Sequence, residues 1–293
     1  MRTGICTTDF EEKNAPRMTA DDLFARIRQY GYTCTQFAFS SVAESGYTPD
    51  GCIEIPGAIA PETLRAIEKA AEKHDLPLCV INGTFNMAHP DEEILKTGLA
   101  RMELLAHAAQ ALGVKYISLC SGTFNREHLW SYSPENETED AWNAMYGTME
   151  RAVETAEKYG ITLAIESEAS NVISTPERAR KLMDAIGSDK LKMILDCANL
   201  FHIGEAHPEN VKSVITHAFE VYGHDIVIAH GKDIREGNGI DFCGTGDGIV
   251  DFALTADLLK QYGYGGDMFL HGIYAQEDMV KAREYWETVS EQR

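Results

Sequence analysis

The sequence predicts an α/β protein built as a (βα)8 barrel, also called a TIM barrel, in which a closed ring of eight parallel strands is surrounded by helices. Two observations carry this prediction. Eight short apolar segments are each followed by a segment with helical periodicity, and four of the strands end in polar residues. We expect one domain over residues 1–293, because no change of composition marks a boundary.

The expected strands follow one another at regular intervals. Strands buried on both faces of a parallel sheet are short and almost continuously apolar. They are expected at residues 5–7, 35–39, 78–81, 116–120, 163–168, 193–196, 226–230 and 268–271. The main alternative is an open doubly wound sheet. It is disfavoured because no GxGxxG fingerprint follows the first strand.

Helix signals separate the strands. Thr19 is the expected N-cap of the first helix, with Asp22 at its N3 position, and Gly31 ends that helix. Pro61 and Pro176 stand in the first turn of two later helices. The eight expected helices span about residues 19–31, 61–71, 92–112, 141–159, 175–187, 209–222, 251–262 and 277–289.

Composition limits the class of partner. Lys and Arg number 26 and Asp and Glu number 46, which gives a formal charge of −20. This acidity argues against nucleic acid and against an anionic membrane as partner. The seven cysteines are odd in number and form no CxxC pair, as in a reduced, cytoplasmic protein without a disulfide framework. Neither a signal peptide nor a membrane-spanning run is expected from the sequence.

Four expected strands end in a side chain that binds metals. Glu166, Asp196, His230 and His271 follow the fifth to eighth apolar runs, and parallel strands bring their carboxyl ends to one rim. A single Glu, Asp or His at such a position is often a helix cap or a structural hydrogen-bonding group. The set of four predicts a divalent metal site. Mixed oxygen and nitrogen ligands suit Mn, Co, Mg, Fe or Zn.

A metal at this rim would polarise the carbonyl of a bound polyol and stabilise an enediolate-like charge. Proton transfer then requires a carboxylate or histidine beside the metal. The expected catalytic residues are Glu166, Glu168 and His271. Glu168 has the strand parity of Glu166 and is a candidate base. Its alternative role is a hydrogen bond to a metal ligand or to Lys232.

Four further residues are expected to bind substrate. Lys232 would contact a substrate oxygen, or pair with Asp233 or with a ligand carboxylate. Asn199 would donate to a substrate hydroxyl, or cap the helix that follows. Trp130 lies in a long aromatic loop and would pack on a sugar, or only anchor the loop, and Asn86 lies in the loop after the third strand. The glycine-rich segment 244–248 would cradle a phosphate with backbone N–H groups, or form only a turn.

With these motifs the chain resembles the sugar-phosphate isomerase/epimerase superfamily, which has a xylose isomerase-like barrel. The resemblance covers nearly the whole chain and is most specific at residues 164–166, 196–200, 230–233 and 246–252. It implies a divalent metal and proton abstraction next to the carbonyl of a ketose or ketose phosphate. Glu166, Asp196 and His230 match three of the usual metal ligands. Members are commonly dimers or tetramers, so a homo-oligomer is expected.

The chain also departs from the family pattern. His271 stands where many members have a Glu that is both ligand and acid/base group, and Asp196 and Asn199 form DxxN, as in hexulose-phosphate epimerases. We expect a metal-dependent sugar or sugar-phosphate isomerase or epimerase. The Glu/Asp/His/His set also resembles the site of C-glycoside-cleaving relatives, which work with a second, smaller subunit. A lyase or C-glycoside deglycosidase using His271 or Glu168 as base, and a non-catalytic carbohydrate-binding barrel, are therefore alternatives.

Overall fold

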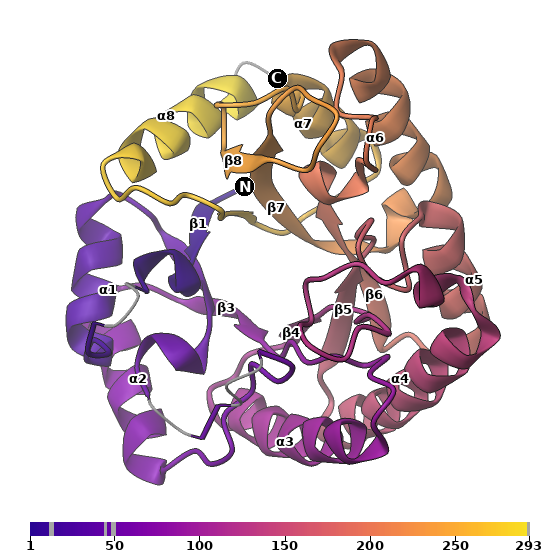
Figure 1. The fold of residues 1–293 in the computed structure, drawn as a ribbon. Helices are drawn as coiled ribbons and strands as arrows, with labels where there is room; N and C mark the ends of the chain where they lie inside the picture. Colours follow the sequence, from indigo (N-terminus) through magenta and orange to yellow (C-terminus); the bar gives the residue numbers. More distant parts are fainter. Residues whose placement is uncertain (12–14, 44–45, 48–50, 292–293) are drawn as a thin grey trace.

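A computed structural model describes residues 1–11, 15–43, 46–47 and 51–291. Within these ranges eight parallel strands close into a barrel, and eight α-helices form a ring outside it (Figure 1). The predicted (βα)8 fold is confirmed. In the same ranges no helix combines the length and apolar character needed to cross a bilayer.

The barrel strands pair in sequence order. The first six run from β1 to β6, β6 pairs with β7, and β9 lies between β7 and β1 and closes the ring. Their bounds are β1 (Thr3–Cys6), β2 (Cys34–Phe37), β3 (Leu78–Asn82), β4 (Tyr116–Leu119), β5 (Thr162–Glu166), β6 (Leu191–Asp196), β7 (Ile226–Ile234) and β9 (Met268–Leu270). Closure pairs both edges of each barrel strand and brings all eight carboxyl ends to one rim.

The helices begin and end near the predicted signals. Their bounds are α1 (Ala20–Gln29), α2 (Pro61–His74), α3 (Glu92–Ala111), α4 (Glu139–Tyr159), α5 (Pro176–Ile186), α6 (Pro208–Tyr222), α7 (Phe252–Gln261) and α8 (Asp278–Glu291). Thr19 caps α1 by accepting a hydrogen bond from the backbone N–H of Asp22 at 3.1 Å. This N-cap confirms the prediction, because it satisfies an N–H that has no partner inside the helix.

Apolar side chains fill the barrel interior below the carboxyl-end rim. The inner cluster consists of one residue from each of seven strands, Cys6, Cys34, Val80, Ala164, Ile194, Ile228 and Phe269. Gly4 makes room for this layer, since a Cβ there would lie 2.7 Å from the Phe269 ring. The strand parity of these residues continues upward to Glu166, Asp196, His230 and His271. The apolar floor therefore directs the predicted metal ligands inward.

The seventh strand differs from the prediction. β7 does not end at His230 but continues to Ile234, and its last part pairs antiparallel with β8 (Phe242–Gly244). The segment from His230 to Ile234 is buried although most of its residues are polar. The search for apolar runs therefore could not identify it as part of a strand. As a consequence Lys232 stands on a strand and has the same parity as His230.

Asp233 accounts for the glycine-rich segment 244–248. Its carboxylate accepts hydrogen bonds from the backbone N–H groups of Gly246, Gly248 and Val250 at 2.9 to 3.1 Å. A Cβ on Gly248 would lie 2.3 Å from the carbonyl oxygen of Ile234, so only glycine fits there. The N–H groups that would have cradled a phosphate are engaged by this internal carboxylate, which agrees with the alternative of a structural turn.

Candidate active site

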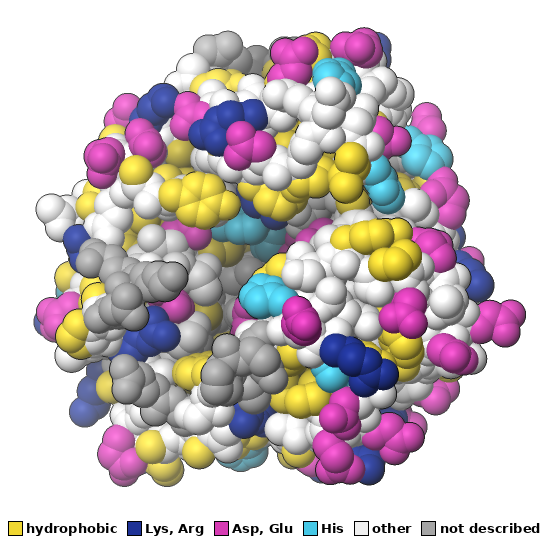
Figure 2. All heavy atoms as spheres, viewed as in Figure 1, with side chains coloured by type: hydrophobic (Ala, Val, Ile, Leu, Met, Phe, Trp, Pro, Cys, Tyr) yellow, Lys and Arg dark blue, Asp and Glu magenta, His cyan; other side chains and the backbone are white. Residues whose placement is uncertain are grey.

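A cavity of about 540 Å³ opens at the carboxyl-end rim of the barrel, where Figure 2 shows the surface hollowed. Its lining residues are Asp9, Trp130, Tyr132, Glu166, Glu168, Ala169, Ser170, Asn199, Phe201, Lys232, Ile240, Phe242, His271, Gly272 and Tyr274. Six of the predicted site residues are in this set. Asp196 and His230 are buried in contact with it. Parallel strands and loops far apart in sequence thus meet in one place.

Three of the four predicted metal ligands form a compact group. The ligand atoms of Asp196, His230 and His271 all lie within 4.8 Å of one another. Oδ2 of Asp196 lies 3.0 Å from Nε2 of His271 and 3.8 Å from Nδ1 of His230. The register pairs Asp196 with His230 on neighbouring strands, so their side chains point to the same side. This buried group has the composition of a metal site.

Glu166 lies beside the group on the next strand. Its Oε1 atom is 3.8 Å from Nδ1 of His230, and its Oε2 atom accepts a hydrogen bond from Asn199 Nδ2 at 2.6 Å. Burial and the adjacent Asp196 carboxylate raise the pKa of Glu166 to about 8. A cation between these carboxylates would remove the repulsion that raises this pKa.

His230 shows that a metal would fit. Its Nε2 atom lies 2.9 Å from Oε1 of Gln36, which fixes the ring with the proton on Nε2. Nδ1 then carries no proton and presents its lone pair. It is buried, faces Asp196 and Glu166, and has no hydrogen-bond partner among the described residues. Burial and the neighbouring His271 lower the pKa of His230 well below its usual range, so the ring is neutral. A neutral, oriented imidazole with a free nitrogen is a suitable metal ligand.

Lys232 and Asn199 link the carboxylates. The Lys232 ammonium donates to Asn199 Oδ1 at 2.5 Å and lies 3.3 Å from Asp196 Oδ2, so it pairs with a predicted ligand carboxylate and not with Asp233. Burial would lower the pKa of Lys232, but the surrounding carboxylates outweigh it and raise the pKa. Asn199 does not cap the helix that follows. It lies inside a 3-10 turn (Cys197–Leu200) that Asp196 caps by accepting from the backbone N–H of Ala198, and the N-cap of α6 is His207.

Burial would also raise the pKa of the Asp196 carboxyl, but two neighbouring groups outweigh it. The Lys232 ammonium lies 3.3 Å away and the His271 ring 3.0 Å away, and both favour the ionised form. The net pKa of Asp196 is well below its usual range. Asp196 is therefore the permanent negative charge of the site.

Glu168 provides a carboxylate that faces the cavity. β5 ends at Glu166, two residues earlier than predicted, and the loop that follows buries Glu168. Oε1 accepts from Ser170 Oγ at 2.5 Å, whereas Oε2 is buried and without a hydrogen-bond partner in the described ranges. Burial raises the pKa of Glu168, and the positive charge of Lys232 offsets this only in part.

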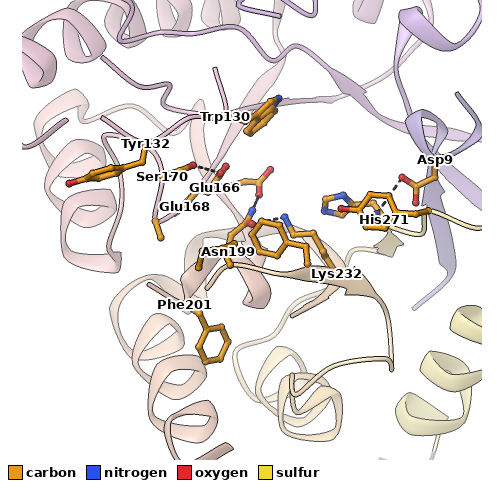
Figure 3. A pocket seen from close by; sticks show the side chains of 15 residues that line it. Asp9, Trp130, Tyr132, Glu166, Glu168, Ser170, Asn199, Phe201, Lys232 and His271 are labelled. Atoms are coloured by element: carbon orange, nitrogen blue, oxygen red, sulfur yellow. Dashed lines mark hydrogen bonds between the residues drawn. The ribbon is translucent and has the colours of Figure 1, made fainter. Parts of the chain in front are cut away.

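Asp9 lines the same cavity and was not expected from the sequence. It lies in a 3-10 turn (Thr7–Phe10) after β1 and accepts from the backbone N–H groups of Gly272 and Ile273 at 3.3 and 3.1 Å. Burial raises its pKa to about 6. Figure 3 shows Asp9 and Glu168 on opposite sides of the cavity, with His271 and Lys232 between them. The sequence signal that could have identified Asp9 is its position as a carboxylate three residues after the end of β1.

Trp130 and Asn86 differ in their placement. The Trp130 ring lies at the cavity rim, where its Nε1–H donates to Glu54 at 3.1 Å, a partner that the sequence did not suggest. Asn86 is fully buried and is not among the residues that line the cavity. Its Oδ1 atom accepts from the backbone N–H groups of Ala88 and Thr123, so this side chain braces two loops.

Two sequence relatives are similar to this chain. Inosose dehydratase of Glaesserella parasuis serovar 5 (strain SH0165) is 24% identical over 311 residues, a match that covers 97% of this chain and 93% of that protein. L-ribulose 3-epimerase of Mesorhizobium japonicum (strain LMG 29417 / CECT 9101 / MAFF 303099) is 28% identical over 158 residues, covering 52% of this chain and 48% of that protein. By name, one of these relatives is a dehydratase and the other an epimerase.

A solved structure shares the fold. The crystal structure of the IOLI protein with a binding zinc atom superposes with a TM-score of 0.67 at 16% identity and covers 100% of this chain and 97% of that one. Residues 24–288 also match the model of the xylose isomerase-like TIM barrel family. That match runs from within α1 to within α8 and includes all four rim positions from Glu166 to His271. The chain therefore belongs to the xylose isomerase-like TIM barrel family.

Proposed function

We propose that this protein is a divalent-metal-dependent isomerase or epimerase that moves a proton next to the carbonyl of a sugar or related polyhydroxylated compound. The observation that carries the proposal is the position of Glu168. Glu168 lines the cavity beside the Asp/His/His group, and its buried Oε2 atom has no hydrogen-bond partner among the described residues. A base beside a metal group is the arrangement that proton abstraction next to a carbonyl requires.

The metal would be held by Asp196, His230 and His271, with Glu166 as the fourth ligand. The bound ion would supply Lewis-acid polarisation of the substrate carbonyl. The chain itself orients the ligands: Gln36 fixes the His230 ring, and Asn199 holds one oxygen of Glu166. Such partners determine ring tautomer and carboxylate direction.

Two carboxyl groups would exchange protons with the substrate. Glu168 would accept the proton, because burial makes it a stronger base than a solvated glutamate. Lys232 would donate a hydrogen bond to the substrate oxygen on which negative charge develops. Asp9 lies across the cavity from Glu168 and would return a proton to the other face (Figure 3). Transfer from one face to the other inverts the carbon, which is an epimerisation.

A second candidate is dehydration. The end-to-end match with an inosose dehydratase favours it. In this reaction Glu168 would remove the proton next to the carbonyl, the C–O bond to the neighbouring hydroxyl would break, and Asp9 would protonate the leaving oxygen to give water. The first step is common to both candidates, so the position of Glu168 supports each of them.

Hydrogen exchange in D2O tests the shared step. The protein, supplied with Mn2+ or Zn2+, would be incubated with a panel of ketoses, ketose phosphates and inososes and followed by proton NMR. We expect deuterium at the carbon next to the carbonyl, together with an epimer or isomer in one case and loss of water in the other. Metal-loaded protein that binds a sugar but exchanges no hydrogen on any of them would contradict the proposal and indicate a carbohydrate-binding barrel.

A further inference from the structure

A second cavity, of about 490 Å³, lies at the amino ends of the barrel strands, away from the candidate active site. Arg2, Cys79 and Asp267 are among its lining residues. Arg2 directly precedes β1 and Asp267 directly precedes β9, so the amino ends of neighbouring strands form its wall. The proposed reaction at the carboxyl-end rim uses none of these residues.

Two thiols meet beside this cavity. The sulfur atoms of Cys34 and Cys79 and a carboxylate oxygen of Asp267 all lie within 4.8 Å of one another. Cys34 is fully buried in the inner cluster of the barrel, whereas Cys79 is partly exposed. The other five cysteines are buried. Cys79 is therefore the thiol that a dissolved reagent reaches, and Cys34 is the thiol beside it.

A β-bulge places Cys79 next to its partner. Thr35 of β2 pairs with Leu78, and Gln36 pairs with Val80, so the register skips Cys79. An extra residue of this kind bends the strand and changes the direction of its side chain. Cys34 and Cys79 stand on strands about 4.8 Å apart, and neighbouring strands allow the Cα separation that a disulfide needs.

Arg2 supplies a positive charge to the thiol pair. Its Nη2 atom donates to Cys79 Sγ at 3.3 Å, and the same guanidinium holds Asp267 through bonds of 2.7 and 3.0 Å. The hydrogen bond from Cys34 and the charge of Arg2 lower the pKa of Cys79, although burial opposes them. The pKa of Cys34 is raised by that hydrogen bond and by burial. The contact with Arg2 and the lowered pKa favour ionisation of Cys79, and Cys34 lies beside it, which is the arrangement of an oxidisable dithiol.

Two thiols and a carboxylate would also suit a soft metal ion. Here both Asp267 oxygens bind Arg2, and the guanidinium already neutralises the negative charge. A cation would have to displace Arg2, so the geometry favours oxidation over metal binding.

We infer that Cys34 and Cys79 form a peroxide-sensitive dithiol that closes to a reversible disulfide between β2 and β3. The Cys79 thiolate attacks hydrogen peroxide. An S–O bond forms, the O–O bond breaks, and the released hydroxide takes a proton to become water. The Cys34 sulfur then loses its proton and attacks the sulfenic acid, so that an S–S bond forms, the S–O bond breaks and a second water leaves. Two thiols are oxidised and one peroxide is reduced to two waters.

Mass spectrometry of the wild-type protein tests this inference. After treatment with hydrogen peroxide in metal-free buffer, we expect a loss of about 2 Da and a single cross-linked peptide pair containing Cys34 and Cys79, both reversed by dithiothreitol. Cys34→Ser should stop at a sulfenic acid on Cys79 that dimedone traps. Arg2→Ala should slow the oxidation about three- to tenfold. Cys120→Ser removes a buried thiol elsewhere and serves as the matched control with unchanged kinetics.

Two results would overturn the inference. One is the absence of this cross-link while other cysteines oxidise at the same or a greater rate. The other is stoichiometric Zn2+ or Cd2+ bound to the wild type and lost in Cys79→Ser, which would assign the cluster to a metal. Either result comes from the wild-type chain or from a variant shown by circular dichroism to be folded, so a folding defect cannot be mistaken for it.

Discussion

The two ends of the barrel each gather three side chains of the types that can bind metals, but the two groups differ in charge and in hydrogen bonding. At the carboxyl-end rim, Asp196, His230 and His271 meet, and the His230 Nδ1 atom has no partner among the described residues. At the amino-end rim both oxygens of Asp267 bind Arg2. A group that leaves a buried acceptor without a partner has room for a cation, whereas a group that contains its own cation does not. Proximity of ligand atoms alone therefore does not identify a metal site.

The largest expected effect concerns the base. Glu168→Gln keeps the shape of the side chain and its hydrogen bond with Ser170 but removes the basic oxygen. We expect deuterium exchange on a substrate to fall by about 10²- to 10⁴-fold. Metal content should stay at the wild-type level, because Glu168 is not among the proposed ligands. Exchange at the wild-type rate in this variant would remove Glu168 from the proposed mechanism.

The next effect compares the two ends directly. His271→Ala removes one of three grouped ligands, so we expect the affinity for Mn2+ or Zn2+ to fall by at least about 100-fold, measured by metal analysis and calorimetry. Cys79→Ser is the matched change at the other end and should leave metal content unchanged. Equal metal content in His271→Ala and wild type, or no metal uptake by the wild type, would refute the carboxyl-end site.

A smaller loss of metal affinity is expected when Gln36, the hydrogen-bond partner of His230, is changed. Gln36→Leu removes the acceptor that orients His230, and we expect metal affinity to fall by about 10- to 100-fold. Gln36→Glu keeps an acceptor at this position and should preserve most of the affinity. If the two variants bind metal equally well, the hydrogen bond at 2.9 Å does not orient the ring.

The smallest effect sharpens the comparison from the amino end. Arg2→Ala frees Asp267 and removes the cation, so this end should gain weak Zn2+ binding, about tenfold tighter than in the wild type. The Arg2–Asp267 pair is partly exposed, and its loss should cost less than about 1 kcal/mol of unfolding free energy. Calorimetry with Zn2+ measures the first change and urea unfolding the second. Unchanged Zn2+ affinity would show that Arg2 does not exclude metals.

Much of the fold was predictable because it depends on local patterns. Apolar runs of strand length, helix caps such as Thr19 and the order of elements lie within short segments, and the barrel follows from their alternation. The rim positions of Glu166, Asp196, His230 and His271 were predictable for a related reason. Parallel strands give all carboxyl ends one direction, and the period of two in a strand sets which side chains point inward.

Other features depend on contacts between distant segments. β7 continues beyond His230 because β8 pairs with its polar end. Apolar periodicity could not predict this pairing, because the paired segment of β7 is mostly polar. The same holds for Asp9, which reaches the cavity through backbone groups 263 and 264 residues away. Asn86 looked like a cavity residue from its loop position, yet the structure uses it to brace a neighbouring loop.

The sequence by itself determined that eight strands alternate with eight helices and that Glu166, Asp196, His230 and His271 share one rim. Periodicity and strand polarity are properties of short segments, so they can be recognised from the sequence alone. Only the tertiary structure decided which atoms meet. It leaves a nitrogen of His230 and an oxygen of Glu168 without a hydrogen-bond partner in the described part of the chain, and it places a thiol pair beside Arg2. These contacts join residues far apart in the chain, and the closure of the barrel sets their distances and burial.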